Sequence, residues 1–308
     1  MKNTLLILIS FLFFSSAALM AQDTTLPKKW QKSGAVGLNF SQSHLSNWAA
    51  GGENALNWQG ILNYGINYAD DIKKWDNNIS LALGYSHLGD SKAIKTDDKI
   101  ELNSLFGYKA TEKLFYTLEF SFKTQFADGF DYKKDSSTPI SGLMSPGYFT
   151  LGLGMQYVPN KYFSINFAPL TARVTIVSDQ ALADAGKYGV DPAAFDSIGG
   201  QYVKVKDGKN SRFELGAKLI AKLSIPIVEN VSFDSKLELF SDYLKNPQNI
   251  DVDWQNLITL KVNSWLSTNI TAHLIYDDDI MITDKDGNTG PRTQFKEVLS
   301  IGISYKLK

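Results

Sequence analysis

The sequence contains no cysteine among its 308 residues. This absence excludes disulfide bridges, thiolate metal sites and a cysteine nucleophile. An excess of basic residues is also missing, because 31 Lys and Arg are balanced by 32 Asp and Glu, for a net charge of −1. We therefore expect no nucleic-acid partner. Beyond the first 22 residues there is no apolar run of about 18 residues, so we expect no spanning helix in the mature chain.

The first segment of the chain has the pattern of an export signal. It combines one basic residue, Lys2, with an apolar run at residues 5–14 and a small-residue stretch that ends at Ala21. The apolar run is too short for a transmembrane helix, which needs about 20 residues. We predict a signal peptide at residues 1–21, with cleavage near its end and export of the mature protein.

From residue 34 onward, polar and apolar residues alternate with a period of two. This period is typical of strands with one apolar and one polar face. Many of these segments exceed the five or six residues usual in soluble strands and match the roughly 9–11 residues needed to cross a bilayer at a tilt. We count 12 of them, at 34–44, 54–69, 75–88, 98–109, 114–127, 147–158, 162–177, 211–225, 231–243, 250–263, 267–277 and 293–308.

The connections between these segments alternate between short turns and longer loops, of which 128–146 and 178–210 are the longest. Aromatic residues flank the short turns: Tyr68, Trp75, Tyr108, Phe115, Tyr116, Tyr157, Tyr162, Phe163 and Trp265. An even strand number, short turns at one rim and an aromatic girdle are the layout of an outer-membrane barrel. We predict an all-β fold, a 12-stranded antiparallel transmembrane β-barrel over 34–308, with 22–33 as a periplasmic segment, in the outer membrane of a Gram-negative bacterium.

The stretch "LSNWAAGGENALN" interrupts the alternation at the expected first outer loop. Residues 46–54 within it resemble an uncharacterised family of Bacteroidota outer-membrane proteins, known only as a domain of unknown function. The resemblance implies residence in the outer membrane of such bacteria, and it implies no activity. The loop motif that we single out comprises Asn47, Trp48, Gly51, Gly52 and Glu53. Its glycines allow a tight bend, but its role stays open.

The polar faces of the predicted strands carry charges of both signs. The lumen or constriction candidates are Arg173, Glu119, Lys123, Arg212, Glu214 and Lys218. A water-filled lumen uses opposed charges to sort solutes, whereas a narrow barrel fills itself with ion pairs and conducts nothing. Both alternatives fit the sequence. Arg173 follows Pro169, which cannot donate to a ladder and so indicates a bulge or a change of facing.

Two outer loops carry further signals. The stretch "SDQALADAGKYGV" in 178–210 predicts one short helix. The acidic stretch "YDDDIMITDKDGN" offers five aspartates, Asp277, Asp278, Asp279, Asp284 and Asp286, that resemble only a fragment of a calcium loop. We interpret this stretch as a solvated acidic loop, and we expect neither a metal nor a cofactor.

The leading functional prediction is porin-like passage of small solutes, with loops 128–146 and 178–210 restricting the mouth. The alternative is a non-conducting barrel that binds a partner of unknown kind through its outer loops. A third, weaker hypothesis is a hydrolase at the rim with His44 or His87 as its base. No catalytic motif supports that hypothesis, and we expect the protein not to be an enzyme. The expected partners are the lipid bilayer and lipopolysaccharide.

Overall fold

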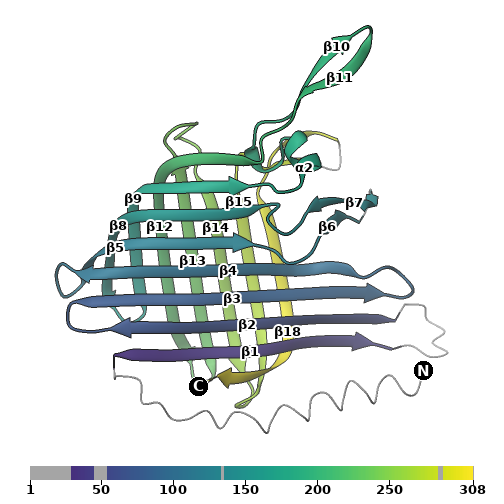
Figure 1. Cartoon of the computed structure of the whole chain (residues 1–308). Coiled ribbons are helices and arrows are strands. Elements are labelled where there is room, and N and C mark those ends of the chain that lie inside the picture. The colour runs from purple at the N-terminus through teal and green to yellow at the C-terminus, as the bar shows by residue number, and fades with distance from the viewer. Residues whose placement is uncertain (1–28, 45–53, 133–134, 284–286, 308) are drawn as a thin grey trace.

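The structure is a computed structural model that describes residues 29–44, 54–132, 135–283 and 287–307. Twelve strands close into an antiparallel barrel in the order β1-β18-β15-β14-β13-β12-β9-β8-β5-β4-β3-β2 (Figure 1). The barrel strands are β1 (Trp30–Ser43), β2 (Ala55–Ala69), β3 (Lys73–Leu88), β4 (Ile94–Lys109), β5 (Leu114–Thr124), β8 (Gly147–Asn160), β9 (Phe163–Ile176), β12 (Ser211–Val228), β13 (Val231–Asp242), β14 (Asp251–Lys261), β15 (Leu266–Tyr276) and β18 (Gln294–Leu307). The predicted fold class and strand number are thereby confirmed.

Each predicted segment corresponds to one barrel strand. The largest differences lie at strand ends: β1 begins at Trp30, so the barrel wall starts before the expected residue 34 and includes part of the segment 22–33. The predicted signal peptide lies outside the described residues. So does the loop motif of Asn47, Trp48, Gly51, Gly52 and Glu53.

The strands place their apolar residues outside and their polar residues inside the barrel. In β5, Leu118 and Phe120 are exposed on the outer surface, whereas the alternating residues Thr117, Glu119 and Ser121 are buried. Successive side chains of a strand point to opposite faces, so one period-two sequence builds both surfaces. The apolar surface of this barrel therefore faces outward.

A bulge lies where Pro169 interrupts β9. The register shifts between Gly216 and Lys218 on the β12 side, and between Leu153 and Met155 on the β8 side. The missing N–H of proline cannot enter a ladder, so an extra residue is accommodated there. Gly154 sits opposite the bulge, where a Cβ atom would collide with the backbone of β9. The predicted bulge is confirmed.

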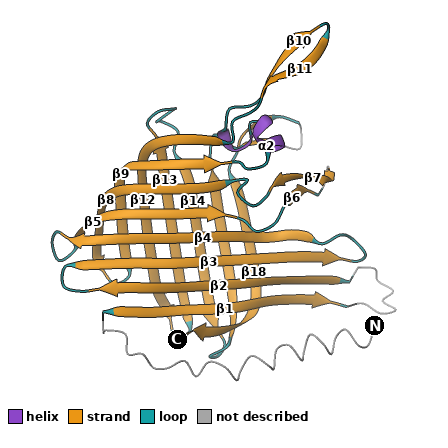
Figure 2. Ribbon diagram, in the orientation of Figure 1, coloured by secondary structure: helices purple, strands orange, loops and turns teal. Residues whose placement is uncertain are grey.

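The outer loops contain short elements that the period of the sequence did not indicate (Figure 2). Three two-stranded sheets form there, from β6 (Gly129–Asp131) with β7 (Asp135–Ser141), β10 (Ala194–Ile198) with β11 (Gln201–Lys206), and β16 (Met281–Thr283) with β17 (Thr289–Pro291). The predicted short helix is present as α2 (Gln180–Asp184), followed by the 3-10 turn η1 (Lys187–Gly189). Within the described residues, no helix has the length and apolar character needed to cross a membrane.

The long loop 178–210 divides into two parts. Its first part packs at the barrel mouth through a small buried cluster of Val177, Leu182, Ala183 and Val190. The hydroxyl of Tyr188 donates to the carbonyl of Ile140 at 2.8 Å and so joins this part to loop 128–146. The second part, the β10–β11 hairpin, projects away from the barrel (Figure 1). Only the first part lies where it can restrict the mouth. The expectation that loop 178–210 restricts the mouth therefore applies to its first part and not to the hairpin.

Asp184 anchors the base of the projecting hairpin. Its carboxylate accepts hydrogen bonds from the Lys204 ammonium at 2.7 Å, from the Gln180 amide at 2.7 Å and from the backbone N–H of Gly208 at 2.8 Å. These donors favour the ionised carboxylate and lower the pKa of Asp184 to about 2. The base of the hairpin is thus held by one half-buried carboxylate.

This anchor predicts an acid-dependent hairpin. The pKa of Asp184 is depressed from an unfolded value near 3.9, so its contribution is complete above about pH 4 and is lost as the pH falls through about 2. We expect a spin label on Ser197→Cys to report a rigid hairpin down to about pH 4 and a mobile one near pH 2. Electron paramagnetic resonance line shapes measure this change. Asp184→Asn should remove it, and a label that stays rigid through the whole range would contradict the assignment.

Candidate functional site

The barrel lumen contains the main concentration of charged side chains. The same alternation that exposes Leu118 and Phe120 turns Glu119 and Lys123 of β5 inward. Charges on β4, β12, β13 and β14 meet them there, because the closed ladder directs the polar face of each strand to the same interior. The charged side chains of the barrel strands are therefore concentrated in the lumen, which we take as the candidate site.

A central cluster spans the lumen from β4 and β5 to β13. The Lys123 ammonium lies 2.8 Å from a Glu238 carboxylate oxygen, and the Lys236 ammonium lies 2.7 Å from the other oxygen. Lys236 also contacts Glu101 of β4 at 2.9 Å, and Lys123 contacts Asp253 of β14 at 3.3 Å. Charges of opposite sign thus alternate across the interior, and the two glutamates are buried.

A second group lies beside this cluster, on the β5, β9 and β12 wall. Lys218 donates to one oxygen of Glu119 at 2.7 Å, and the Asn166 amide donates to the other at 2.9 Å. The hydroxyl of Thr117 in turn donates to the Asn166 carbonyl oxygen at 2.8 Å. All four side chains are buried. An ion pair this deep is neutralised and fully hydrogen-bonded, as buried charges require.

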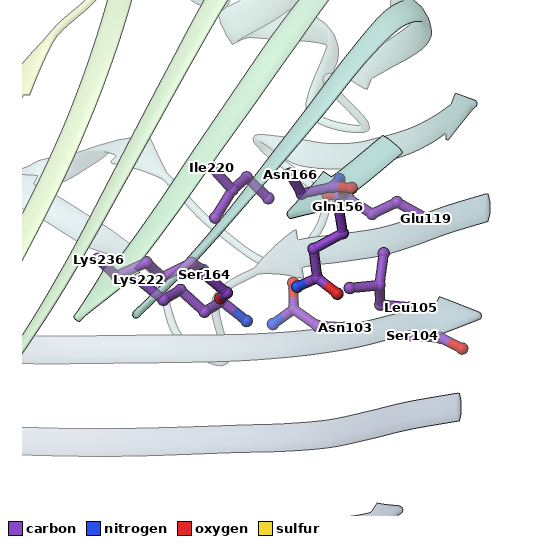
Figure 3. Close-up of a pocket in the computed structure, with 10 residues that line it drawn as sticks. All are labelled: Asn103, Ser104, Leu105, Glu119, Gln156, Ser164, Asn166, Ile220, Lys222 and Lys236. Atoms are coloured by element: carbon purple, nitrogen blue, oxygen red, sulfur yellow. The ribbon is translucent and has the colours of Figure 1, made fainter. Parts of the chain in front are cut away.

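A small cavity remains between these groups. Figure 3 shows Glu119, Gln156, Asn166, Lys222 and Lys236 around it. Its volume is about 30 Å³. A cavity needs at least roughly 10–15 Å³ to hold a water molecule, so this one has room for ordered water. This side of the lumen is closed by packed side chains.

A third group surrounds Arg173 toward the outer rim. Arg173 makes a bidentate pair with Glu214, whose side chain is 1% exposed, and contacts Asp251 at 2.8 Å. Its guanidinium stacks over the Phe240 ring at 4.1 Å. Arg212 contacts the same glutamate at 3.1 Å. The planar fork of arginine suits such a bidentate and stacked position.

The six predicted lumen residues are brought together as ion pairs. Arg173, Glu119, Arg212, Glu214 and Lys218 belong to packed groups, whereas Lys123 is half-buried at the edge of the central cluster. A constriction role stays a prediction for each of them. Sequence reasoning missed their partners Asp251 and Asp253, although both alternate with the apolar Val252 and Trp254. The period of two would have revealed them.

The opposite side of the lumen is accessible to solvent. Lys99 of β4 and Lys296 of β18 have side chains that are 39% and 41% exposed, compared with 6% and 7% for Glu119 and Lys218. Asp97, at 2.9 Å from Lys296, is also partly exposed. The packed groups thus fill the β5 to β13 side, whereas charged side chains of β4 and β18 on the other side are partly accessible to solvent.

The acidic residues of the outer rim form one group. Carboxylate oxygens of Asp251, Asp277 and Asp278 lie within 4.8 Å of one another. Arg173 already provides positive charge to this group, and Asn249 donates to Asp278 at 2.6 Å. Burial raises the pKa of the Asp277 carboxyl. The other aspartates of the predicted acidic loop, Asp284 and Asp286, lie outside the described residues.

The two outer histidines are exposed at strand ends. His87 pairs with Leu56 across the β2–β3 ladder, and His44 directly follows the last residue of β1. Both lie at the outer rim, as a hydrolase active site would require, and the hydrolase hypothesis stays a prediction.

A family model described as a protein of unknown function (DUF3078) matches residues 40–130. This range contains the SNWAAGGEN block, and the match agrees with the expected resemblance to a domain of unknown function. No curated protein matches the chain.

Several solved barrels are similar in structure. An outer membrane channel from Pseudomonas putida F1 is 12% identical, covers 92% of this chain and 97% of its own, and has a TM-score of 0.40. The NanC porin is 10% identical, with coverages of 89% and 100% and a TM-score of 0.36. A FadL homologue from Pseudomonas aeruginosa is 9% identical, with coverages of 91% and 76% and a TM-score of 0.31.

The buried Lys218–Glu119 pair yields a stability prediction. Lys218→Met leaves the Glu119 carboxylate buried without its nearest cation, so we expect a loss of about 3–5 kcal/mol in the free energy of unfolding. The double variant Lys218→Met/Glu119→Gln should regain most of this loss, because neutral glutamine can still accept from Asn166. Urea unfolding in lipid vesicles measures both.

A matched control is Lys206→Met, which removes an exposed lysine from the projecting hairpin and should change stability little. Equal losses in the single and double variants would show that the unpaired charge is not the cause.

Proposed function

We propose that the protein is an outer-membrane barrel that passes small polar solutes through an eccentric passage beside Lys99 and Lys296. The observation that carries the proposal is the unequal lumen. Charged side chains are buried in packed groups on the β5 to β13 side, whereas those on the opposite side are accessible to solvent. A barrel that only anchors a partner has no need for an accessible charged passage.

The outer surface supports insertion in a membrane. Large apolar side chains are exposed on most of the barrel strands, and a soluble protein rarely exposes so many of them. The rings of Trp30, Tyr68 and Trp75 gather at the short-turn rim, with centroids 5.0 and 6.2 Å apart. Such rings prefer the headgroup level. The bilayer and lipopolysaccharide would then be the immediate partners, in an organism that the SNWAAGGEN resemblance assigns to the Bacteroidota.

One residue of the predicted girdle does not belong to it. Phe115 alternates with the outward residues of β5 and turns inward, where the Lys74 ammonium lies 4.3 Å from its ring centroid. Its neighbour Tyr116 is exposed on the outer surface. The girdle prediction grouped both rings by their closeness to the short turn, whereas the period of two in β5 turns adjacent residues to opposite faces.

The β10–β11 hairpin favours a second candidate function. Tyr202 is 84% exposed, and Phe195 and Ile198 are also exposed on this projecting element. Apolar side chains held away from the barrel are suited to contact another macromolecule. A partner-binding barrel with a closed lumen therefore remains the alternative.

Single-channel recording in a planar bilayer tests the leading proposal. We expect small, discrete conductance steps whose preference shifts toward cations in Lys99→Gln, because that variant removes a positive charge from the passage. Lys206→Gln on the hairpin should leave the reversal potential unchanged. Arg173→Ala should lower stability and leave selectivity as it is, since Arg173 belongs to a packed group. Silence from a folded, inserted protein would overturn the proposal and favour the partner-binding alternative.

A further inference from the structure

The seam between the first and last barrel strands is incomplete. β1 pairs with β2 along its whole length, Trp30–Ser43. Its ladder with β18 runs only from Gly34 to Asn39, which pairs with Gly302. Among the described residues, the ladder stops there, although both strands continue toward the outer rim. In Figure 1, β18 lies beside β1 near its C-terminal end and then turns away from it.

The outer face of β18 carries exposed apolar side chains along its whole length. Leu299 and Phe295 on the outer face of β18 are 69% and 64% exposed. Leu153 and Phe167, in the wall between β8 and β9, are 51% and 49% exposed. Tyr305, which pairs with Val36 in the closed half of the seam, is 70% exposed, so the open half is defined by the ladder and not by side-chain exposure. An open strand edge is not tolerated against lipid chains, because its backbone groups have no hydrogen-bond partner there.

A polar latch joins the two edges inside the lumen. Asn39 of β1 donates to Gln59 of β2 at 2.7 Å, and Gln59 donates to Asp97 of β4 at 2.5 Å. Lys296 of β18 then donates to the same carboxylate at 2.9 Å. The latch begins at Asn39, which forms the last pair of the ladder. Beyond this pair, side-chain contacts replace backbone hydrogen bonds as the connection between the two strands. Its link to β18 is one solvent-accessible ion pair.

We propose that this seam is a lateral portal that admits a single-chain amphiphile with a carboxylate head, such as a fatty acid, from the outer leaflet to the lumen. The proposal rests on the proposed membrane location. The acyl chain lies along the apolar outer side chains of the seam, Phe40 and Leu299. The head exchanges with the Asp97 carboxylate at Lys296, because the group that the latch lysine holds is itself a carboxylate.

The height of the seam suits such a ligand. Glu297 alternates with Phe295 and Leu299 on the outer face, and it is exposed. A carboxylate that faces lipid is costly in the apolar core of a bilayer and much less so near the interface. This side chain therefore places the open part of the seam close to the headgroups, where the polar heads of single-chain amphiphiles reside. An amphiphile can enter there without carrying its head through the apolar core.

Fluorescence quenching tests the portal directly, and the cysteine-free chain makes labelling specific. A bimane probe on Ser300→Cys, which faces the lumen beside the seam, is measured in phosphatidylcholine vesicles that contain doxyl-labelled stearic acid. A probe on Gln255→Cys is the control, because β14 has complete ladders with both of its neighbours. We expect several-fold stronger quenching at position 300. Equal quenching at the two positions would overturn the portal.

The ligand class is tested with a second quencher and two variants. Doxyl-labelled phosphatidylcholine, with two chains and no net charge, should quench the probe at position 300 less than doxyl-stearate does. Lys296→Met should remove the advantage of stearate, while Lys99→Met, at another exposed lumen lysine, should retain it. Equal quenching by both lipids, or an advantage that survives in Lys296→Met, would overturn the assignment of a carboxylate ligand.

A reversible cross-link separates this proposal from the proposed function. If the ladder continued, Ser41 would face Ser300, so Ser41→Cys/Ser300→Cys can close the open half of the seam. The pair Gly37→Cys/Ser304→Cys is the control in the closed half, where a Cβ at position 37 lies 4.0 Å from the Cβ of Ser304, within disulfide range.

For this readout the bimane is attached to Val298→Cys, beside the seam on the same lumen face. Oxidation of the first pair should abolish quenching by doxyl-stearate, and reduction should restore it, with conductance unchanged throughout. Oxidation of the control pair should alter neither readout. Undiminished quenching in the oxidised first pair would refute the portal even if the channel conducts.

Discussion

The pairing of backbone groups in the barrel wall is the constraint on which the remaining structure depends. Each strand has to find a neighbour on both sides, and 12 strands meet this requirement by closing on themselves. Closure turns the two faces of a strand into the inside and the outside of the molecule. The period of two then sorts the side chains, with apolar residues such as Leu118 outside and polar residues such as Glu119 inside. The charged lumen is a direct consequence of this geometry.

Charges confined to an interior have to neutralise one another. Here the pairs connect strands that are distant in the chain, as in Lys123 with Glu238 and Lys236 with Glu101. Removing two charges from water costs about as much as their attraction returns. The pairs therefore add little net stability, while an unmatched partner costs a great deal. The ion pairs therefore favour one register of the strands and one packing of side chains in the lumen. This packing determines which side of the lumen is accessible to solvent.

Much of the architecture could be read from local sequence, because strand period and turn length are local properties. The 12 strands, the bulge at Pro169 and the short helix at Gln180–Asp184 were all accessible in this way. Phe115 was misplaced, since one residue of phase at a turn exchanges the two faces of a strand. Asp97 was missed because a register shift beside it breaks the alternation in β4.

The partners of the lumen charges could not be predicted from sequence. Whether Arg173 meets Glu214 and Asp251 depends on the stagger of all the strands around the barrel. A list of inward charges therefore gives the composition of the lumen but does not say which charges pair with each other or which part of the lumen they close. Lys99 and Glu119 both face the lumen, one accessible and one buried, and no local pattern distinguishes them.

Two kinds of connection hold the barrel strands together, and they are distributed unevenly. The β5 to β13 wall has complete ladders and is also braced by ion pairs such as Lys218 with Glu119. The seam between β1 and β18 has six ladder pairs and, beyond them, the latch through Asp97 and Lys296. Because β1 and β18 are the ends of the barrel chain, no hairpin turn links them. Separation at the seam therefore leaves every turn and the packed ion pairs intact. The solvent-accessible charges of β4 and β18 lie on the same side of the lumen as this weakest part of the wall. The packed half of the barrel is thus the half with complete ladders, and the half with an accessible lumen is the one whose strands can separate.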